Sequence, residues 1–276
     1  MRTITIANQK GGCGKTTTAV NLAAAFGRRE YRTLLIDLDP QGHSTIGFGY
    51  EPDEITTTVY DALVKSRTGI DSVTIGTKIA SLDLAPSNVL LSGAEIDLVG
   101  VARREFVLRE KLEQVQDKYD VCIIDCPPSL GLLTLNALLA ATGVIVPVQV
   151  QYYATEGLKQ IFETAHIIEN QFHPHRLTIL GVLLTLAENS TLLSKQIQQQ
   201  MRDVLGHLVF ETVISKSIKL AEAPSNGEPV LTYAPKSKAA AEYNSLTEEI
   251  MKNWALLDEI KALAEEINSD QVLVGR

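Results

Sequence analysis

Short aliphatic runs alternate along the chain with segments whose apolar residues recur at helical spacing. The aliphatic runs predict strands at Thr3–Ala7, Thr33–Ile36, Leu82–Ala85, Val121–Ile124, Val144–Val150, Leu177–Leu186 and Leu208–Val213. The helical spacing predicts helices at Thr17–Arg28, Ala94–Val101, Glu105–Gln116, Leu130–Ala141, Gly157–Asn170, Leu192–Leu205 and about 239–268. Because strands that alternate with helices form right-handed crossovers, the pattern predicts an α/β fold with a single doubly wound, mainly parallel sheet flanked by helices.

The composition fits one folded domain. Of the 276 residues, 45% are apolar and 21% are charged, so the chain can bury a sizeable core. No repeat, low-complexity run or linker interrupts the order of elements, and we expect a single domain over residues 1–276. The first predicted strand begins two residues after Met1, which predicts that no helix-turn-helix domain precedes it. We therefore do not expect sequence-specific operator binding.

One stretch has the hydropathy of a membrane span. Residues 126–155 carry no charged side chain, which is long enough to cross a bilayer. Pro127, Pro128 and Pro147 interrupt it, and Gly143 divides a helix-like half from a β-branched half. A buried helix followed by a buried strand explains this pattern, so we expect no membrane span.

The charge and the cysteines narrow the class of protein. A formal charge of −8 argues against a protein that coats nucleic acid over its whole surface, but it leaves room for a local basic patch. Three cysteines, Cys13, Cys122 and Cys126, fit a reducing compartment better than a disulfide framework. Cys122 and Cys126 are interpreted as small buried hydrophobic residues of a strand. The alternative is a metal or cluster that they share between two subunits.

A glycine-rich segment between the first strand and the first helix carries the strongest chemical signal. Its residues are Gly11, Gly12, Cys13, Gly14, Lys15, Thr16 and Thr17. Glycines allow successive backbone N–H groups to face an anion, and the start of the following helix adds its positive dipole end. Lys15 is placed to reach the β- and γ-phosphates of a nucleotide, and Thr16 to hold Mg²⁺. The usual G-x-x-x-x-G-K-[ST] pattern is not met in full, since Gln9 stands where the first glycine normally falls.

Acidic residues follow two of the predicted strands. Asp125 comes directly after Val121–Ile124 and is placed like a Walker B aspartate, which helps to hold Mg²⁺. Asp37 and Asp39 follow Thr33–Ile36. Since ligands of open parallel sheets bind beyond the carboxyl ends of the strands, all three are candidates for the nucleotide site. The alternative for Asp37 and Asp39 is a cap on the loop beside that site.

A second lysine, Lys10, stands at the start of the glycine-rich segment. The run of residues 10–17 resembles the deviant Walker A box of the ParA/MinD family of P-loop ATPases. Further segments resemble its chromosome-partitioning ParA (Soj-type) branch: residues Ala7–Lys10, Leu35–Gly42, Ile124–Ser129, Tyr152–Tyr153, Glu156–Leu158, Leu220–Ser225 and Pro235–Lys238. The resemblance therefore covers nearly the whole chain, from residue 4 to about residue 250.

The resemblance implies a deviant P-loop NTPase fold, ATP and Mg²⁺ as cofactors, and a homodimer that sandwiches two ATP molecules. In such a dimer Lys10 reaches the partner's phosphates, as an arginine finger does, and Asp39 positions or activates the attacking water. Lys10, Lys15 and Asp39 are thus the implied catalytic residues, and Thr17 contacts the α-phosphate. The implied nucleotide contacts are Lys10, Gly11, Gly12, Cys13, Gly14, Lys15, Thr16, Thr17, Asp125 and Pro127. The implied metal site comprises Thr16, Asp37 and Asp125.

The family dimer also binds DNA without sequence preference, through basic residues of the C-terminal half. Lys216, Lys219, Lys236 and Lys238 fall on matching segments, and Lys195 and Arg202 lie on a predicted helix nearby. The alternative for each lysine is a solvated face. Lysine contacts to phosphates explain binding that is independent of sequence and sensitive to salt. Three departures from the family pattern weaken this step. Residues 186–191 lack an arginine, Lys216 and Lys219 stand where arginine is common, and Gln151 stands where glutamate is common.

The function implied is a weak ATPase that acts as a timed switch. ATP-bound dimers would sit on the nucleoid in the cytoplasm, and a ParB-like partner would stimulate hydrolysis to segregate a chromosome origin or a plasmid. Related branches position carboxysomes or chemoreceptor clusters, and these cargoes stay open. Also open are a MinD-like membrane-associated ATPase, whose basic amphipathic C-terminal helix this acidic C-terminus does not match, and a carrier of iron–sulfur clusters.

Overall fold

The structure is a computed structural model that describes residues 1–151, 163, 165, 166, 168, 170–172 and 177–255. Most of the predicted helix Gly157–Asn170 lies outside the described residues, as do the Tyr152–Tyr153 and Glu156–Leu158 segments. The predicted C-terminal helix is described from residue 238 to residue 255. Among all the residues that the structure describes, no helix combines the length and the apolar character needed to cross a membrane.

Eight strands of the described residues form one sheet in the order β3-β4-β2-β5-β1-β6-β7-β8. Their bounds are β1 Arg2–Ile6, β2 Thr33–Asp37, β3 Ile75–Gly76, β4 Leu82–Ala85, β5 Val121–Asp125, β6 Gly143–Gln149, β7 Thr178–Ala187 and β8 Val209–Ser215. Every pairing is parallel except that of β3 with β4. The predicted α/β fold with a mainly parallel sheet is confirmed. The short antiparallel edge strand β3 was not predicted, because two residues carry no periodic pattern.

The helices of the described residues are mostly short. They are α1 Lys15–Gly27, α2 His43–Ile46, α3 Val59–Val64, α4 Ala94–Asp97, α5 Val107–Glu113, α6 Leu132–Ala140, α8 Leu192–Leu205, α9 Ile218–Glu222, α10 Val230–Tyr233 and the helix 238–255. The predicted helix Ala94–Val101 was wrong in extent, since only the single turn α4 forms. Ile96, Val99 and Val101 are exposed rather than packed, so no apolar stripe holds that segment in a longer helix. The predicted helix Glu105–Gln116 was also too long and shortens to α5.

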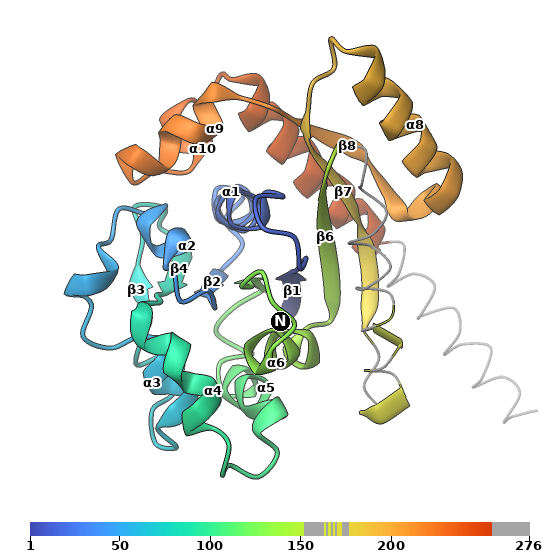
Figure 1. The fold of residues 1–276 in the computed structure, drawn as a ribbon. Helices are drawn as coiled ribbons and strands as arrows, with labels where there is room; N and C mark the ends of the chain where they lie inside the picture. The colour runs from blue at the N-terminus through green and yellow to red at the C-terminus, as the bar shows by residue number, and fades with distance from the viewer. Residues whose placement is uncertain (152–162, 164, 167, 169, 173–176, 256–276) are drawn as a thin grey trace, which may run out of the picture.

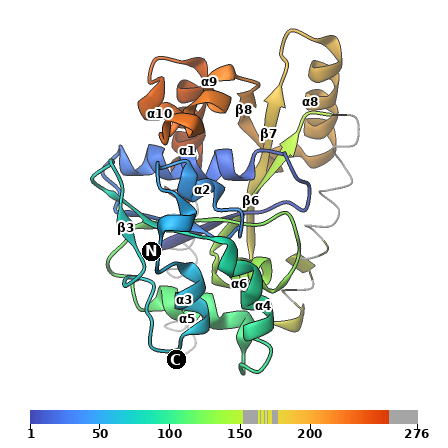
Figure 2. The same cartoon turned by 60° about the vertical axis from the view of Figure 1, so that its left-hand side comes forward.

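Helices cover both faces of the sheet (Figures 1 and 2). α1, α10 and the helix 238–255 lie on one face, and α3, α5 and α6 lie on the other. Successive strand residues point to opposite faces, so that Leu34 and Ile36 join one core cluster while Leu35 joins the other. The central strands are therefore apolar on both sides, which explains why they were recognisable as continuous aliphatic runs.

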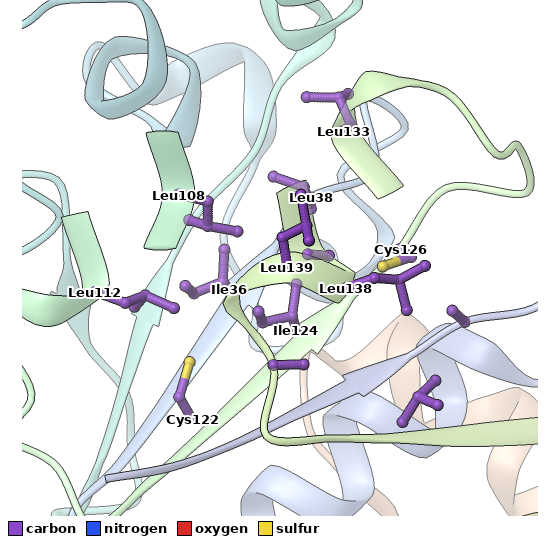
Figure 3. Packing of buried hydrophobic residues seen from close by; sticks show 14 of the residues in the cluster. Ile36, Leu38, Leu108, Leu112, Cys122, Ile124, Cys126, Leu133, Leu138 and Leu139 are labelled. Carbon is purple, nitrogen blue, oxygen red and sulfur yellow. The ribbon is translucent and has the colours of Figure 1, made fainter. Parts of the chain in front are cut away.

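Cys122 and Cys126 lie in the core, as predicted. Figure 3 shows both side chains in the cluster under α5 and α6, with Ile124 between them on the same face of β5. Neither residue is exposed to solvent, and burial raises the pKa of both thiols. A thiol held neutral inside the fold is a poor metal ligand, because the thiolate is the ligand form. The alternative of a cluster shared between subunits finds no support in this placement.

Candidate nucleotide site and lysine face

The carboxyl ends of three neighbouring strands meet at the candidate site. Ile6 of β1 and Asp37 of β2 both lie opposite Asp125 of β5 in the parallel register. The glycine-rich loop leaves β1 directly after Ile6, so the loop and the two aspartates share one edge of the sheet. This is where ligands of open α/β sheets bind.

Two glycines give the loop its shape. Gly12 and Gly14 have φ angles of 71° and 88°, in the left-handed region that favours glycine. Gly14 is also the residue from which α1 begins, so the free N–H groups of that helix open toward the loop. A Cβ atom added at Gly11 or Gly12 would meet nothing within 4 Å, which leaves open space above the loop. The backbone thus forms an anion cradle of the kind the sequence predicts.

Two side chains that sequence reasoning missed fix this loop to the neighbouring strands. Buried Asn8 donates from Nδ2 to the carbonyl oxygen of Pro147 on β6 at 2.7 Å, and its Oδ1 accepts from the backbone N–H of Lys10 at 3.0 Å. Thr185 of β7 donates from Oγ1 to the Cys13 carbonyl at 2.8 Å. Asn8 belongs to the segment Ala7–Lys10 that carries part of the family resemblance, but the sequence predicted no role for it. Thr185 could not be predicted as a contact of the loop, because its partner is 172 residues away in the chain.

The two lysines of the loop have different surroundings. Lys15 is buried, and its Nζ donates to the Lys10 carbonyl at 3.0 Å, where the Cys13 thiol also donates at 3.1 Å. Lys10 is half-buried, and its Nζ donates to Oε1 of Gln151 at 3.3 Å. Lys15 therefore points into its own loop, whereas the Lys10 ammonium lies at the rim of the site.

Asp37 holds the loop that follows β2. Its Oδ2 accepts hydrogen bonds from the N–H and the hydroxyl of Thr45 at 2.8 and 2.7 Å, and its Oδ1 accepts from the N–H of Asp39 at 3.2 Å. Asp39 is itself buried, and its Oδ1 accepts from the N–H of Gln41 at 3.0 Å. Asp37 thereby helps to hold the backbone at Asp39. The metal role predicted for Asp37 stays a prediction, since loop groups occupy both of its oxygens.

Asp125 offers the carboxylate oxygen that a metal ion would need. Its Oδ2 accepts a hydrogen bond from Ser44 at 2.8 Å, whereas its buried Oδ1 has no hydrogen-bond partner among the described residues. Burial, followed by the charge of Asp37, raises the pKa of Asp125 to about 7, while the Ser44 and Thr16 hydroxyls oppose that rise. A cation at Oδ1 would neutralise this buried charge. The Asp125 carboxylate and the Thr16 hydroxyl therefore fit a Mg²⁺ ion that the phosphates of a nucleotide would also bind.

No cluster of three or more His, Cys, Asp or Glu side chains suited to a metal ion occurs in the described part of the chain. Pro127, predicted to contact the nucleotide, is buried directly after Asp125 and Cys126. Its role stays a prediction.

Two cavities border the loop. One of about 350 Å³ is lined by Gly14, Thr17, Thr185, Leu186 and Lys216, with further residues from β8, α9 and the helix 238–255. The other, of about 230 Å³, is lined by Thr16 and Thr17 together with the segment that contains Pro224 and Pro229. Both cavities lie beside Thr17 at the start of α1. The sequence left the residues around the base open.

The six predicted DNA-contacting residues lie around α8, β8, α9 and the start of the helix 238–255, at the upper side of Figures 1 and 2. Most of them are paired with acidic side chains. Lys216 contacts Glu188 at 2.6 Å, Lys219 contacts Glu222 at 2.8 Å, Lys238 contacts Glu242 at 3.4 Å, and Arg202 lies 3.8 Å from Glu211.

The other contacts complete the picture of this lysine face, which we define as Lys195, Arg202, Lys216, Lys219, Lys236 and Lys238. Arg202 also donates to the carbonyls of Phe210 and Glu211. Lys195 and Lys236 are exposed and form no ion pair with the described residues. The predicted cationic side chains thus lie on one side of the molecule, but acidic side chains of the same chain neutralise most of their charge.

A strand, a glycine-rich loop with a buried lysine, a helix, and an aspartate at the end of an adjacent strand define a P-loop nucleotide-binding protein. The protein-family model described as an AAA domain matches residues 1–179. The chromosome partitioning protein ParA of Myxococcus xanthus is 44% identical over 91% of this chain and 88% of its own length. The sporulation initiation inhibitor protein Soj of Bacillus subtilis is 44% identical over 91% of this chain and 98% of its own length. The chain belongs to the ParA/Soj family of P-loop ATPases.

A solved structure extends this likeness to bound nucleotide. Cobyrinic acid a,c-diamide synthase from Mycobacterium smegmatis, with bound ADP and magnesium, is 34% identical to this chain and superposes with a TM-score of 0.81. The match covers 92% of this chain and 96% of the other. The same protein has also been solved with an ATP analogue and magnesium.

Proposed function

We propose that this chain is a weak ATPase that dimerises around ATP, binds DNA without sequence preference and segregates a chromosome origin or a plasmid. A ParB-like partner would stimulate hydrolysis, and the ADP-bound subunits would leave the nucleoid and recycle through the cytoplasm. The chromosome partitioning protein of Myxococcus xanthus, at 44% identity, supports this choice over a cobyrinic acid a,c-diamide synthase, which is the name of a relative at 34% identity. The same switch would serve another cargo equally well.

The observation that carries the proposal is the contrast between the two lysines of the loop. Lys15 is buried and lies against the backbone of its own loop, so it suits phosphates bound in the same subunit. Within the described residues, the Lys10 ammonium donates to the side chain of Gln151 at the rim, so it suits phosphates delivered by a second subunit. A lysine that acts across the interface makes dimerisation depend on ATP, because the γ-phosphate supplies the charge that it contacts.

The remaining residues divide the chemistry among them. Mg²⁺, when bound, would neutralise charge on the β- and γ-phosphates. Thr16 and Asp125 would hold the ion, and Thr17 would contact the α-phosphate. Asp39, positioned by Asp37, would orient or activate the attacking water. The cavity beside Gly14 and Thr17 would receive the adenosine, which its mostly apolar lining suits.

The test is binding to random-sequence duplex DNA with ATP, with ADP and without nucleotide, each at low and at high salt. We expect binding with ATP alone, and a steep loss of affinity with salt. The Lys10→Ala variant should bind ATP as a monomer but fail to form the ATP-dependent dimer. The Asp39→Ala variant should dimerise on ATP without turnover. An intact ATP dimer of Lys10→Ala, or DNA binding that ignores the nucleotide, would refute the proposal.

A further inference from the structure

Three lysines proposed to contact DNA are each engaged by a glutamate of the same chain. The pairs are Lys216–Glu188 at 2.6 Å, Lys219–Glu222 at 2.8 Å and Lys238–Glu242 at 3.4 Å. The hydrogen bonds of these pairs raise the pKa of Lys216 and Lys219 and lower that of Glu222. A DNA phosphate would have to compete with a carboxylate for each ammonium group.

The Lys216 pair differs from the other two in its place in the fold. Glu222 and Glu242 lie three and four residues after their lysines on the same helix, although Lys238 and Glu242 also bond Ser215 of β8. Glu188 and Lys216 are 28 residues apart and lie beyond the ends of two different strands, β7 and β8. The strand ends themselves are joined, because the N–H of Lys216 donates to the Ala187 carbonyl at 3.0 Å. Both paired side chains are exposed, so a rotation of either one separates the pair without distorting a helix or the sheet.

The end of β7 is in contact with the glycine-rich loop. Thr185, three residues before Glu188, donates its hydroxyl proton to the Cys13 carbonyl at 2.8 Å. Between them lies Leu186, a non-glycine residue at a φ angle of 53°, which is a strained backbone position. Leu186 and Lys216 both line the cavity that borders Gly14. A nucleotide that fills the loop and this cavity therefore touches both strand ends that carry the pair.

We propose that Glu188 is an intramolecular counter-ion that keeps Lys216 from DNA until nucleotide binding separates the two side chains. This inference rests on the proposed function, because it concerns how ATP controls DNA binding. While the two side chains are paired, Glu188 opposes DNA binding in two ways. Its carboxylate contacts the ammonium of Lys216, and its negative charge repels a DNA phosphate at the same place. The residue thus sets how strictly DNA binding depends on the nucleotide.

The test compares Glu188→Gln with Glu113→Gln. Both variants change the formal net charge of the chain from −8 to −7, since each removes one negative charge. Glu113 is likewise exposed and ion-paired, with Arg109 at 3.1 Å, but α5 lies on the side of the molecule away from the lysine face (Figures 1 and 2). Any difference between the variants therefore reports position and not net charge. Thermal melting and ATP titration serve as controls that both variants are folded.

Binding to random-sequence duplex DNA is measured for each variant with ATP, with ADP and without nucleotide. In the states without ATP, we expect Glu188→Gln to bind DNA roughly threefold to tenfold more tightly than Glu113→Gln. This range follows because the substitution removes both an exposed ion pair and the repulsion between Glu188 and a DNA phosphate. The slope of log affinity against log salt should steepen by about 0.9, as expected for one added phosphate contact. Adding Lys216→Gln to Glu188→Gln should abolish the gain, because the glutamate acts through that lysine.

The outcomes separate this inference from the proposed function. If the wild-type chain binds DNA with ATP, and Glu188→Gln has the same ratio of ATP-state to ADP-state affinity as Glu113→Gln, the counter-ion role is wrong while the proposed function stands. If no variant binds DNA in any nucleotide state, both the DNA step and the counter-ion role fall. A gain in Glu188→Gln that survives the loss of Lys216 also overturns the proposal.

Discussion

Replacing Asp125 with asparagine should stabilise the nucleotide-free protein at alkaline pH, although it damages the nucleotide site. Asp125 is fully buried, lies opposite Asp37 in the sheet, and leaves Oδ1 without a hydrogen-bond partner among the described residues. An asparagine has nearly the same shape and can still accept the hydrogen bond from Ser44. The substitution therefore removes a buried charge without opening a cavity.

The magnitude follows from the pKa of Asp125, which burial and the charge of Asp37 raise from 3.8 to about 7. Because the pKa is higher in the folded state than in the unfolded state, the folded chain holds the extra proton between these values. The free energy of unfolding must then fall as pH rises through this window and level off above it. From about pH 5 to pH 8 this one group lowers the free energy of unfolding by about 3 kcal/mol.

The assay is denaturant unfolding of the wild type and of Asp125→Asn, nucleotide-free and with a chelator, over this pH range. Other carboxylates titrate too, and those with a lowered pKa, such as Asp61 and Asp120, contribute stability that is lost at acid pH. The difference between the two proteins cancels these contributions. We expect the difference to grow with pH in favour of the variant. An equal pH slope in both proteins would refute the reasoning.

Mg²⁺ and ATP should reverse the order of stability. The ion would neutralise the charge on Asp125, so the wild type should gain more stability from Mg²⁺ and ATP than the variant does. A residue whose replacement stabilises the apoprotein yet weakens ligand binding is typical of a functional site.

Two further predictions concern the side chains that hold the glycine-rich loop. Asn8→Ala removes one buried and one partly buried hydrogen bond and should lower the free energy of unfolding by about 2 kcal/mol. It should also weaken ATP binding in calorimetric titration, whereas Asn136→Ala, which removes a similarly bonded and buried asparagine from α6, should cost similar stability and leave ATP binding intact. Thr185→Val keeps the shape of the side chain but removes its bond to the Cys13 carbonyl, and should weaken ATP binding with a stability loss of about 1 kcal/mol. Equal ATP affinities for Asn8→Ala and Asn136→Ala would contradict the role given to Asn8.

The sheet could be predicted from the sequence because its central strands are buried on both faces. Leu34, Leu35 and Ile36 alternate between the two core clusters, and all three are apolar, so the strand stands out without any periodic pattern. The segment after β4 behaves differently. Its apolar residues Ile96 and Val99 have helical spacing but are exposed, so that spacing predicted a helix which the packing does not support.

The chemistry of the loop could be predicted because its main parts are adjacent in the chain. The backbone cradle, Lys15 and the start of α1 are covalent neighbours, and a local motif is enough to find them. The side chains that hold this cradle in place come from distant segments. Asn8 bonds Pro147, 139 residues away, and Lys10 bonds Gln151, 141 residues away. Such partners depend on strand order, which a single sequence does not specify to this precision.

The ion pairs of the lysine face also divide into contacts between neighbours in the chain and contacts between distant segments. The pairs Lys219–Glu222 and Lys238–Glu242 have the spacing of neighbours on a helix, so they could have been predicted. The pair Lys216–Glu188 could not, since it forms only because β7 and β8 end side by side. A contact between exposed side chains of two different strand ends is also one that a movement of either side chain can break, while the strands stay paired. The pair that was hardest to predict is therefore the one best placed to respond to the nucleotide.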